Sequence, residues 1–213
     1  MSPLSGRYAL LVLAAALAAA VPIALHSLSW MDRDDCADPG AFRATLLIPG
    51  SRPVAGDQEL PRRMLQRSQG SVGSGAPGIP ALEYAIVRSF EPVRLLQRPA
   101  RFVAGRLDAQ DQKLAWTERD GQRLPIHWTF ERTRSLPQFV AYFFVYGSRP
   151  VAHPLLALLG SAPMRLLSGA RPLTLVAIGG QAPPGDLATL EKAAEDWLFE
   201  AWAHYRGVCG EPG

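Results

Sequence analysis

The chain of 213 residues has few of the residue types by which a function is usually recognised in a sequence. It holds two cysteines and four histidines, and its only lysines are Lys113 and Lys192. The 22 basic residues barely exceed the 19 acidic ones, and the arginines are scattered rather than gathered in the basic stripe of a nucleic-acid binder. We therefore expect no nucleic-acid partner and ascribe the preference for arginine to coding bias.

Motifs for cofactors and metals are also missing. The sequence has no Walker loop, no G-x-S-x-G, no H-E-x-x-H and no C-x-x-C, and the spacing of its histidines defines no metal site. Residues 73–78 match G-x-G-x-x-G, the dinucleotide fingerprint. No strand leads directly into them, however, and Pro77 prevents the helix that would bind a pyrophosphate. The sequence predicts no cofactor and no metal.

A long hydrophobic run is present near the N-terminus. Its 18 residues, from Tyr8 to Leu25, contain no charge. As a helix rising ~1.5 Å per residue they would span about 27 Å, close to the thickness of a bilayer core. Arg7 precedes the run and an acidic segment follows it, which favours a C-terminus outside the cytoplasm. The sequence predicts a transmembrane signal anchor at residues 1–27.

The alternative for this segment is a cleaved signal peptide. Ala18-Ala19-Ala20 would serve as a small-residue cleavage site. The apolar run continues past that site, and Trp30 offers an aromatic anchor at the membrane interface. We favour the uncleaved anchor, followed by a polar connector at residues 28–40 and an extracytoplasmic domain at residues 41–209.

The two cysteines lie near the two ends of this domain. Cys36 follows the hydrophobic run, and Cys209 lies four residues from the C-terminus. Both have polar neighbours together with glycine and proline, whereas buried structural cysteines usually lie in apolar stretches. We therefore expect both cysteines to be exposed, and for an exported domain this favours a disulfide between Cys36 and Cys209, the alternative being two free thiols.

Hydrophobic patterns predict an α+β domain with a mainly antiparallel sheet and two helices in its C-terminal half. Asp120-Gly121 is a strong hairpin signal between two strands. A flexible loop is predicted at residues 68–80, where Gly, Ser and Pro are frequent. Strands are predicted at residues 42–48, 82–90, 101–107, 114–118, 123–130, 139–146 and 173–178, and helices at 58–66, 154–167 and 186–207.

A hexapeptide occurs twice. Residues 50–55 and residues 147–152 both read Gly-Ser-Arg-Pro-Val-Ala, and each copy follows a predicted strand. The repeat allows an architecture of two related strand–turn–helix–strand halves. The alternative is coincidence in a sequence rich in Arg, Pro, Gly and Ala, because Gly-Ser-Arg-Pro is also ordinary turn chemistry.

Candidates for catalysis are few. His153 follows the second hexapeptide and precedes a predicted helix, so that Ser148, Arg149 and a distant carboxylate could join it. No such carboxylate can be named from the sequence. His127 would share a face of its strand with Pro125 and Thr129, and we expect it to be a solvated sheet residue rather than a base.

The second half of the chain resembles a known family. An aromatic strand ends in a Tyr-Gly turn (Tyr142-Phe143-Phe144-Val145-Tyr146-Gly147) and is followed by a helix, a strand at Leu173–Ile178 and an amphipathic terminal helix. Together with one N-terminal anchor, this order is similar to the exosortase-associated periplasmic proteins of bacterial exopolysaccharide and protein-sorting systems. The resemblance covers residues 124–205 and the anchor.

The resemblance implies a location and a role. It implies a single-pass protein of the bacterial inner membrane, with its domain in the periplasm and with an envelope protein as partner. We expect an accessory protein of an envelope assembly or export system that acts by binding. The alternatives are an exported hydrolase that uses His153 or His127, and a binding module for an envelope ligand or partner.

Overall fold

The computed structural model describes Cys36 and residues 51–53, 64–73, 81–97, 99–104, 111–131, 137–162, 170–181 and 185–209. The strands are β1 (Ser51–Pro53), β2 (Met64–Val72), β3 (Leu82–Ser89), β4 (Asp111–Arg119), β5 (Gln122–Glu131), β6 (Gln138–Tyr146), β7 (Arg149–Val151) and β8 (Leu173–Gln181). The helices are α3 (Pro92–Gln97), α4 (Arg101–Ala104), α5 (Pro154–Gly160) and α7 (Leu187–Cys209).

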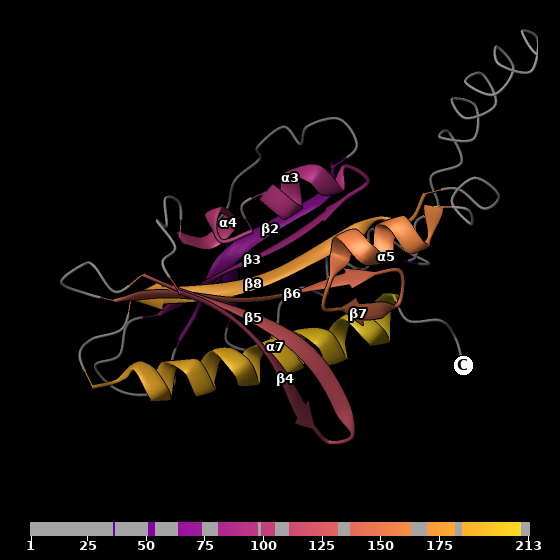
Figure 1. Cartoon of the computed structure of the whole chain (residues 1–213). Coiled ribbons are helices and arrows are strands. Elements are labelled where there is room, and N and C mark those ends of the chain that lie inside the picture. Colours follow the sequence, from indigo (N-terminus) through magenta and orange to yellow (C-terminus); the bar gives the residue numbers. More distant parts are fainter. Residues whose placement is uncertain are drawn as a thin grey trace, which may run out of the picture.

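The strands form one eight-stranded sheet in the order β1-β2-β3-β8-β6-β5-β4, with β7 also paired to β6. Every strand pairing in the described part of the chain is antiparallel. The long helix α7 covers one face of this sheet, and α3, α4 and α5 lie on the opposite face (Figure 1). The predicted α+β class with a mainly antiparallel sheet is therefore confirmed.

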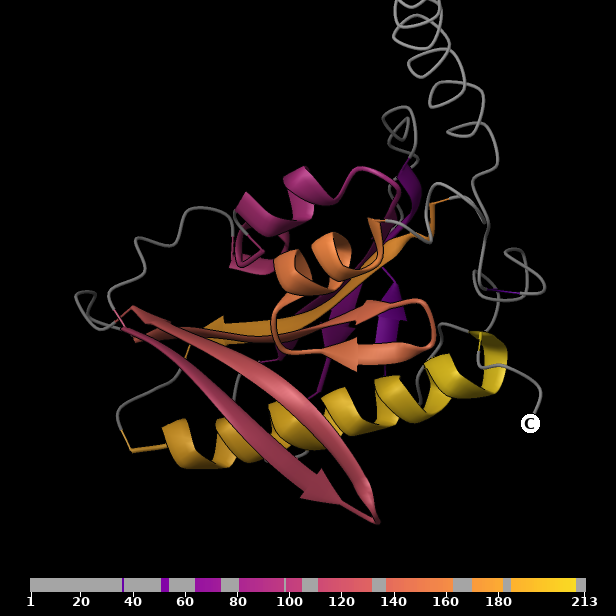
Figure 2. The same ribbon diagram turned by 45° about the vertical axis from the view of Figure 1, so that its right-hand side comes forward.

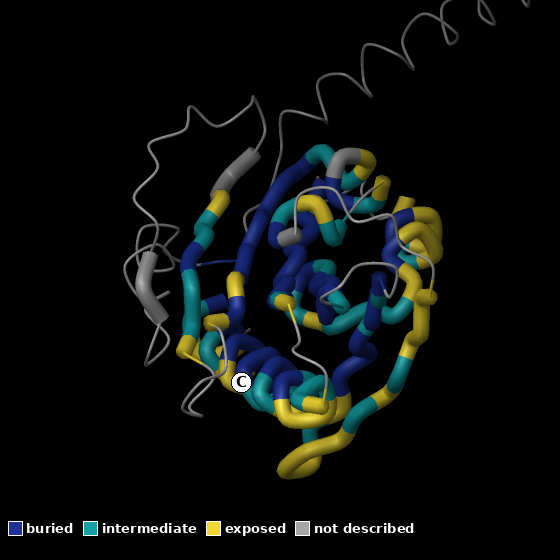
Figure 3. Tube along the Cα trace, turned by 90° about the vertical axis from the view of Figure 1, so that its left-hand side faces the viewer, coloured by how far each residue is buried: buried dark blue, intermediate teal, exposed yellow. Residues whose placement is uncertain are grey.

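The central strands are buried on both faces, which explains why they read as continuous hydrophobic runs rather than as alternating ones. Phe139, Phe143 and Ile178 face α7, where they pack with Trp197 and Leu198. Alternate residues of the same strands face the opposite side, where α3 and α4 lie. There Val87, Val140, Phe144, Leu175 and Ala177 form a second cluster with Leu95 of α3 and Val103 of α4. Figure 3 shows the buried residues gathered in the centre of the domain.

The β4–β5 hairpin is formed as its turn residues predict. Asp120 and Gly121 both have positive φ, 51° and 71°, as a two-residue type I′ turn requires. β4 is the edge strand and is mostly exposed, and the hairpin extends beyond the rest of the sheet (Figures 1 and 2). Near its tip, Arg119 forms an ion pair of 2.7 Å with Asp196 of α7.

Three local predictions are wrong over the residues that the structure describes. The helix predicted at residues 58–66 overlaps β2, which begins at Met64, and the loop predicted from residue 68 is strand as far as Val72. β2 is polar in sequence but pairs along its length with the hydrophobic strand β3, and that pairing overrides local preference. The strand predicted at residues 101–107 instead begins with the helical turn α4, which packs Val103 onto the sheet.

The two hexapeptide copies are paired differently. In the first copy, β1 pairs with the strand that follows it, β2. In the second copy, β7 folds back on the strand that precedes it, β6. The strand predicted at residues 42–48 lies outside the described residues. The identical hexapeptides therefore do not have equivalent positions in the sheet.

The predicted membrane anchor at residues 1–27 also lies outside the described residues. Within the part of the chain that the structure describes, no helix is both long and apolar enough to cross a membrane.

Candidate functional site

The three catalytic candidates lie along the β6–β7–α5 segment. Ser148 is half-buried in the turn between β6 and β7, Arg149 is exposed on β7, and His153 is exposed immediately before α5. Among the described residues, no hydrogen bond or ion pair joins these three side chains to one another or to a carboxylate. The described geometry therefore does not bring them together as a nucleophile with its base.

His127 is more enclosed than its sequence predicts. His127 shares a face of β5 with Pro125 and Thr129, as expected. The chain that leads from β7 into α5 covers this face next to the His127 ring. The His127 ring stacks on Tyr142 with a centroid separation of 5.1 Å. Its Nε2 donates a hydrogen bond of 3.0 Å to the carbonyl oxygen of Ala152. The expectation of a solvated residue is thus wrong, because contacts distant in sequence bury half of the ring.

The protonation of this aromatic pair follows from its surroundings. Burial lowers the pKa of His127 below its usual value of 6.5, the hydrogen bond to Ala152 opposes that shift, and nearby His153 lowers the pKa further. Burial likewise raises the pKa of the Tyr142 hydroxyl, and a hydrogen bond with Thr129 opposes the increase. Both groups are therefore neutral at neutral pH. The hydrogen bond from His127 Nε2 to Ala152 ties the chain before α5 to β5, and the stacking of His127 on Tyr142 holds the ring in place.

A cavity of about 460 Å³ opens at the other end of the same sheet face. It is lined by Ala81, Glu83, Val103, Gln138, Gly179, Gly180 and Gln181, which come from the ends of β3, β6 and β8 and from α4. Its volume lies within the range of roughly 300–1,000 Å³ that is typical of small-molecule sites. No sequence pattern indicated this site, because its residues are far apart along the chain.

Gln138 is the polar group that distinguishes this cavity. Its side chain is 8% exposed, and its Oε1 atom is buried without a hydrogen-bond partner. An unsatisfied buried amide costs roughly 1–3 kcal/mol, so the fold carries this group at a cost in stability. Glu83 and Gln181 are exposed on the same lining and add polar groups at the surface. Polar ligands with hydrogen-bonding groups match such a lining.

The glycine pair at this cavity has a packing role. The sequence predicts that Gly179-Gly180 ends the strand, but β8 continues through both residues to Gln181. A Cβ atom at Gly179 would overlap the backbone carbonyl oxygen of Phe139 on the neighbouring strand. A Cβ atom at Gly180 would meet the side chain of Leu82 at 2.9 Å, and backbone atoms only at 3.9 Å or more. Gly179 therefore permits the close approach of β6 and β8 beneath the cavity.

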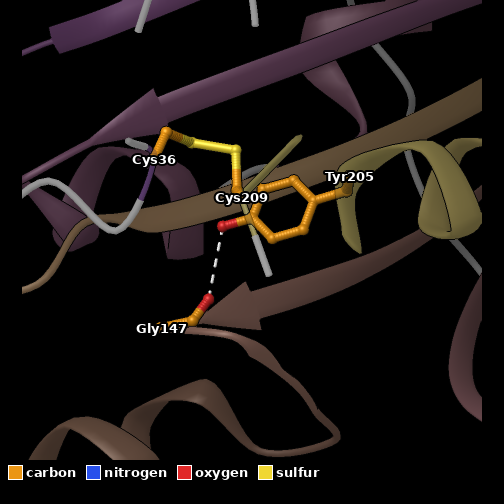
Figure 4. The surroundings of a disulfide bond; sticks show 4 residues. All are labelled: Cys36, Gly147, Tyr205 and Cys209. Carbon is orange, nitrogen blue, oxygen red and sulfur yellow. Dashed lines mark hydrogen bonds between the residues drawn. A yellow bond between two sulfur atoms is a disulfide. The ribbon is translucent and has the colours of Figure 1, made fainter. Parts of the chain in front are cut away.

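The predicted disulfide is present. Cys36 and Cys209 are bonded, but the expectation that they are exposed is wrong, because both pack into the core at 4% and 2% exposure. Four residues before Cys209, the Tyr205 hydroxyl donates a hydrogen bond of 3.2 Å to the carbonyl oxygen of Gly147 (Figure 4). One end of the domain therefore brings together three segments. They are the C-terminal end of α7, the β6–β7 turn and Cys36, which follows the predicted anchor in the sequence.

Within the described residues, no group of three or more His, Cys, Asp or Glu side chains could hold a metal ion. Comparisons of the chain with protein-family models, with curated proteins and with solved structures find no match.

Proposed function

We propose that the protein is a membrane-anchored accessory protein of an envelope assembly or export system, and that its extracytoplasmic domain acts by binding. The Cys36–Cys209 disulfide carries this proposal. Disulfides persist in oxidising compartments and are rare in the cytosol. Cys36 lies eleven residues after the hydrophobic run, so a helix that crosses the membrane delivers the domain directly into such a compartment.

The sheet-end cavity supports a binding role for this domain. It combines a ligand-sized volume with the buried amide of Gln138, which has an unmet hydrogen-bonding atom. Buried polar groups without partners destabilise a fold, so each needs an explanation, and a ligand that reaches the amide is the one proposed here.

Fractionation of cells that express the full chain tests the location. We expect full-length protein in the membrane fraction, a mobility shift between non-reducing and reducing gels, and digestion of the domain by protease added outside the cytoplasmic membrane. A soluble cytosolic protein with two free thiols would overturn the proposal. The Cys36→Ser and Cys209→Ser double variant is the control for the mobility shift.

Photocrosslinking tests the binding role. A photoreactive amino acid replaces the exposed Gln181 at the cavity, and a matched variant carries it at the exposed Lys192 on α7. We expect an adduct that depends on the Gln181 position and is lost with Gln138→Met. Equal adducts at both positions would refute the cavity as the binding site.

The alternative, an exported hydrolase, predicts hydrolytic activity that is lost with His153→Ala.

A further inference from the structure

The short helix α5 exposes an unusual amount of apolar surface. Its leucines Leu155, Leu156 and Leu159 are 61%, 64% and 69% exposed, whereas Leu158 is buried against the sheet. The described residues 150–162 contain no Asp, Glu, Lys or Arg, so no charge interrupts this leucine face. Contiguous exposed apolar side chains of this kind mark surfaces that contact a partner or a membrane.

The position of α5 relative to the disulfide indicates what the leucine face contacts. Beyond the last turn of α5, the hydroxyls of Ser161 and Tyr146 share a hydrogen bond of 2.9 Å. Tyr146 is followed by Gly147, whose carbonyl oxygen accepts the hydrogen bond from Tyr205, one helical turn before Cys209. The C-terminal end of α5 and the Cys36–Cys209 disulfide therefore lie at the same end of the sheet.

The chain between the hydrophobic run and the disulfide limits how far this end can move from a membrane. Eleven residues lead from Leu25 to Cys36. Fully extended they span at most about 40 Å, and a flexible segment of that length is usually much shorter. Since the disulfide fixes Cys36 to the domain, the same connector keeps the disulfide end of the domain, and α5 with it, within that reach of the membrane.

We propose that the leucine face of α5 docks onto the lipid bilayer, with Leu155, Leu156 and Leu159 inserted at the depth of the headgroups and upper acyl chains. The inference rests on the proposed membrane anchor. Exposed leucines on a helix partition into this interfacial layer. Arg149, which is exposed on the adjacent strand β7, adds a cation that suits anionic phospholipid headgroups. Docking orients the domain and turns α7, on the opposite sheet face, away from the lipid.

Fluorescence in vesicles tests this docking on the full-length chain. Ala162, exposed just after α5, is replaced by Cys and labelled with the environment-sensitive dye NBD, because the native cysteines are already paired. The protein is reconstituted into vesicles of phosphatidylcholine and phosphatidylglycerol, with and without doxyl-labelled lipid. A matched control carries the label at Ala203, an exposed residue of α7. A third protein combines the Ala162 label with Leu155→Gln, Leu156→Gln and Leu159→Gln.

We expect the label at position 162 to emit at shorter wavelength and to be quenched by doxyl lipid. The label at position 203 and the label in the triple glutamine variant should remain unquenched. If the protein floats with the vesicles but the label at position 162 is not quenched, the docking is refuted while the anchor stands. A blue shift without lipid quenching assigns the face to a protein surface and overturns the lipid assignment. If the protein does not float with the vesicles, the anchor and the docking both fail.

Discussion

Loss of the Cys36–Cys209 disulfide should destabilise the domain severely. The bond joins residues 173 positions apart, so it closes nearly the whole domain into one covalent loop. In the chain-entropy model, a loop of this length restricts the unfolded chain by about 5 kcal/mol. A typical domain has a total stability of roughly 5–15 kcal/mol, so the bond supplies a third or more of it. The double variant Cys36→Ser and Cys209→Ser removes the bond without leaving a free thiol.

Urea unfolding of the full-length protein in detergent, followed by tryptophan fluorescence, measures this loss. Trp197 and Trp202 are buried on α7 and report directly on its packing against the sheet. For a slope of about 2 kcal/mol/M, a loss of 5 kcal/mol lowers the unfolding midpoint by about 2.5 M. The oxidised wild type, the same protein with dithiothreitol and the double variant are compared. The two forms without the bond should unfold at about the same midpoint.

The effect of dithiothreitol on the double variant is the control, and its effect on the wild type tests the loop-closure reasoning. Dithiothreitol should leave the midpoint of the double variant unchanged, which shows that the reductant acts through the disulfide alone. If reduction of the wild type leaves its midpoint unchanged, the loop-closure reasoning is refuted. The domain would then hold its two ends together without the covalent bond.

Three further perturbations have expected outcomes. The folded-state pKa of His127 lies below its ordinary value of 6.5, so its contribution to stability is complete above pH 6.5 and is lost as the pH falls from there through the lowered pKa. The variant His127→Gln, whose carboxamide can still donate to Ala152, should remove this part of the pH dependence of thermal unfolding. An unchanged pH profile would contradict the assignment. Gln138→Met removes a buried acceptor without a partner and should raise the free energy of unfolding by about 1 kcal/mol. The control Gln181→Met, at the exposed edge of the same cavity, should change the free energy of unfolding by less than about 0.5 kcal/mol. Equal effects of the two variants would show that the buried amide carries no cost. Gly179→Ala forces a Cβ atom against backbone and should lower the free energy of unfolding, measured by chemical denaturation, by about 1–3 kcal/mol. Gly180→Ala should lower it by less, because only a side chain must move. The reverse order would refute the close approach of β6 and β8.

Several features of this protein could be read from the sequence because their cause is local. Asp120-Gly121 adopts the positive φ angles of a tight hairpin, which few other residue pairs tolerate. The stripe that includes Leu190, Ala194 and Trp197 has helical spacing, and those residues are the buried face of α7. The two cysteines stood out as a pair by their number and their positions, and they are bonded.

Other features could not be read from the sequence, because they depend on contacts between distant segments. β2 is polar between its first two residues and Val72, and its strand structure comes with its pairing to β3. β8 lies between β3 and β6, although the β4–β5 hairpin, β6 and α5 separate β3 from β8 in the chain. Strand order of this kind depends on which edges are free when the sheet forms, and no local pattern encodes it.

The candidate site belongs to this second group. His127 carries no local sign of burial, and its stacking on Tyr142 and its bond to Ala152 exist only after β6, β7 and α5 fold over β5. The cavity is formed by the ends of β3, β6 and β8 together with α4, so its lining is defined only once the strands are in register. Hydrophobic periodicity, turn chemistry and the cysteine pair determined the class of the domain. The side chains that share a surface were decided by long-range packing, because burial and pKa depend on neighbours that the sequence does not place side by side.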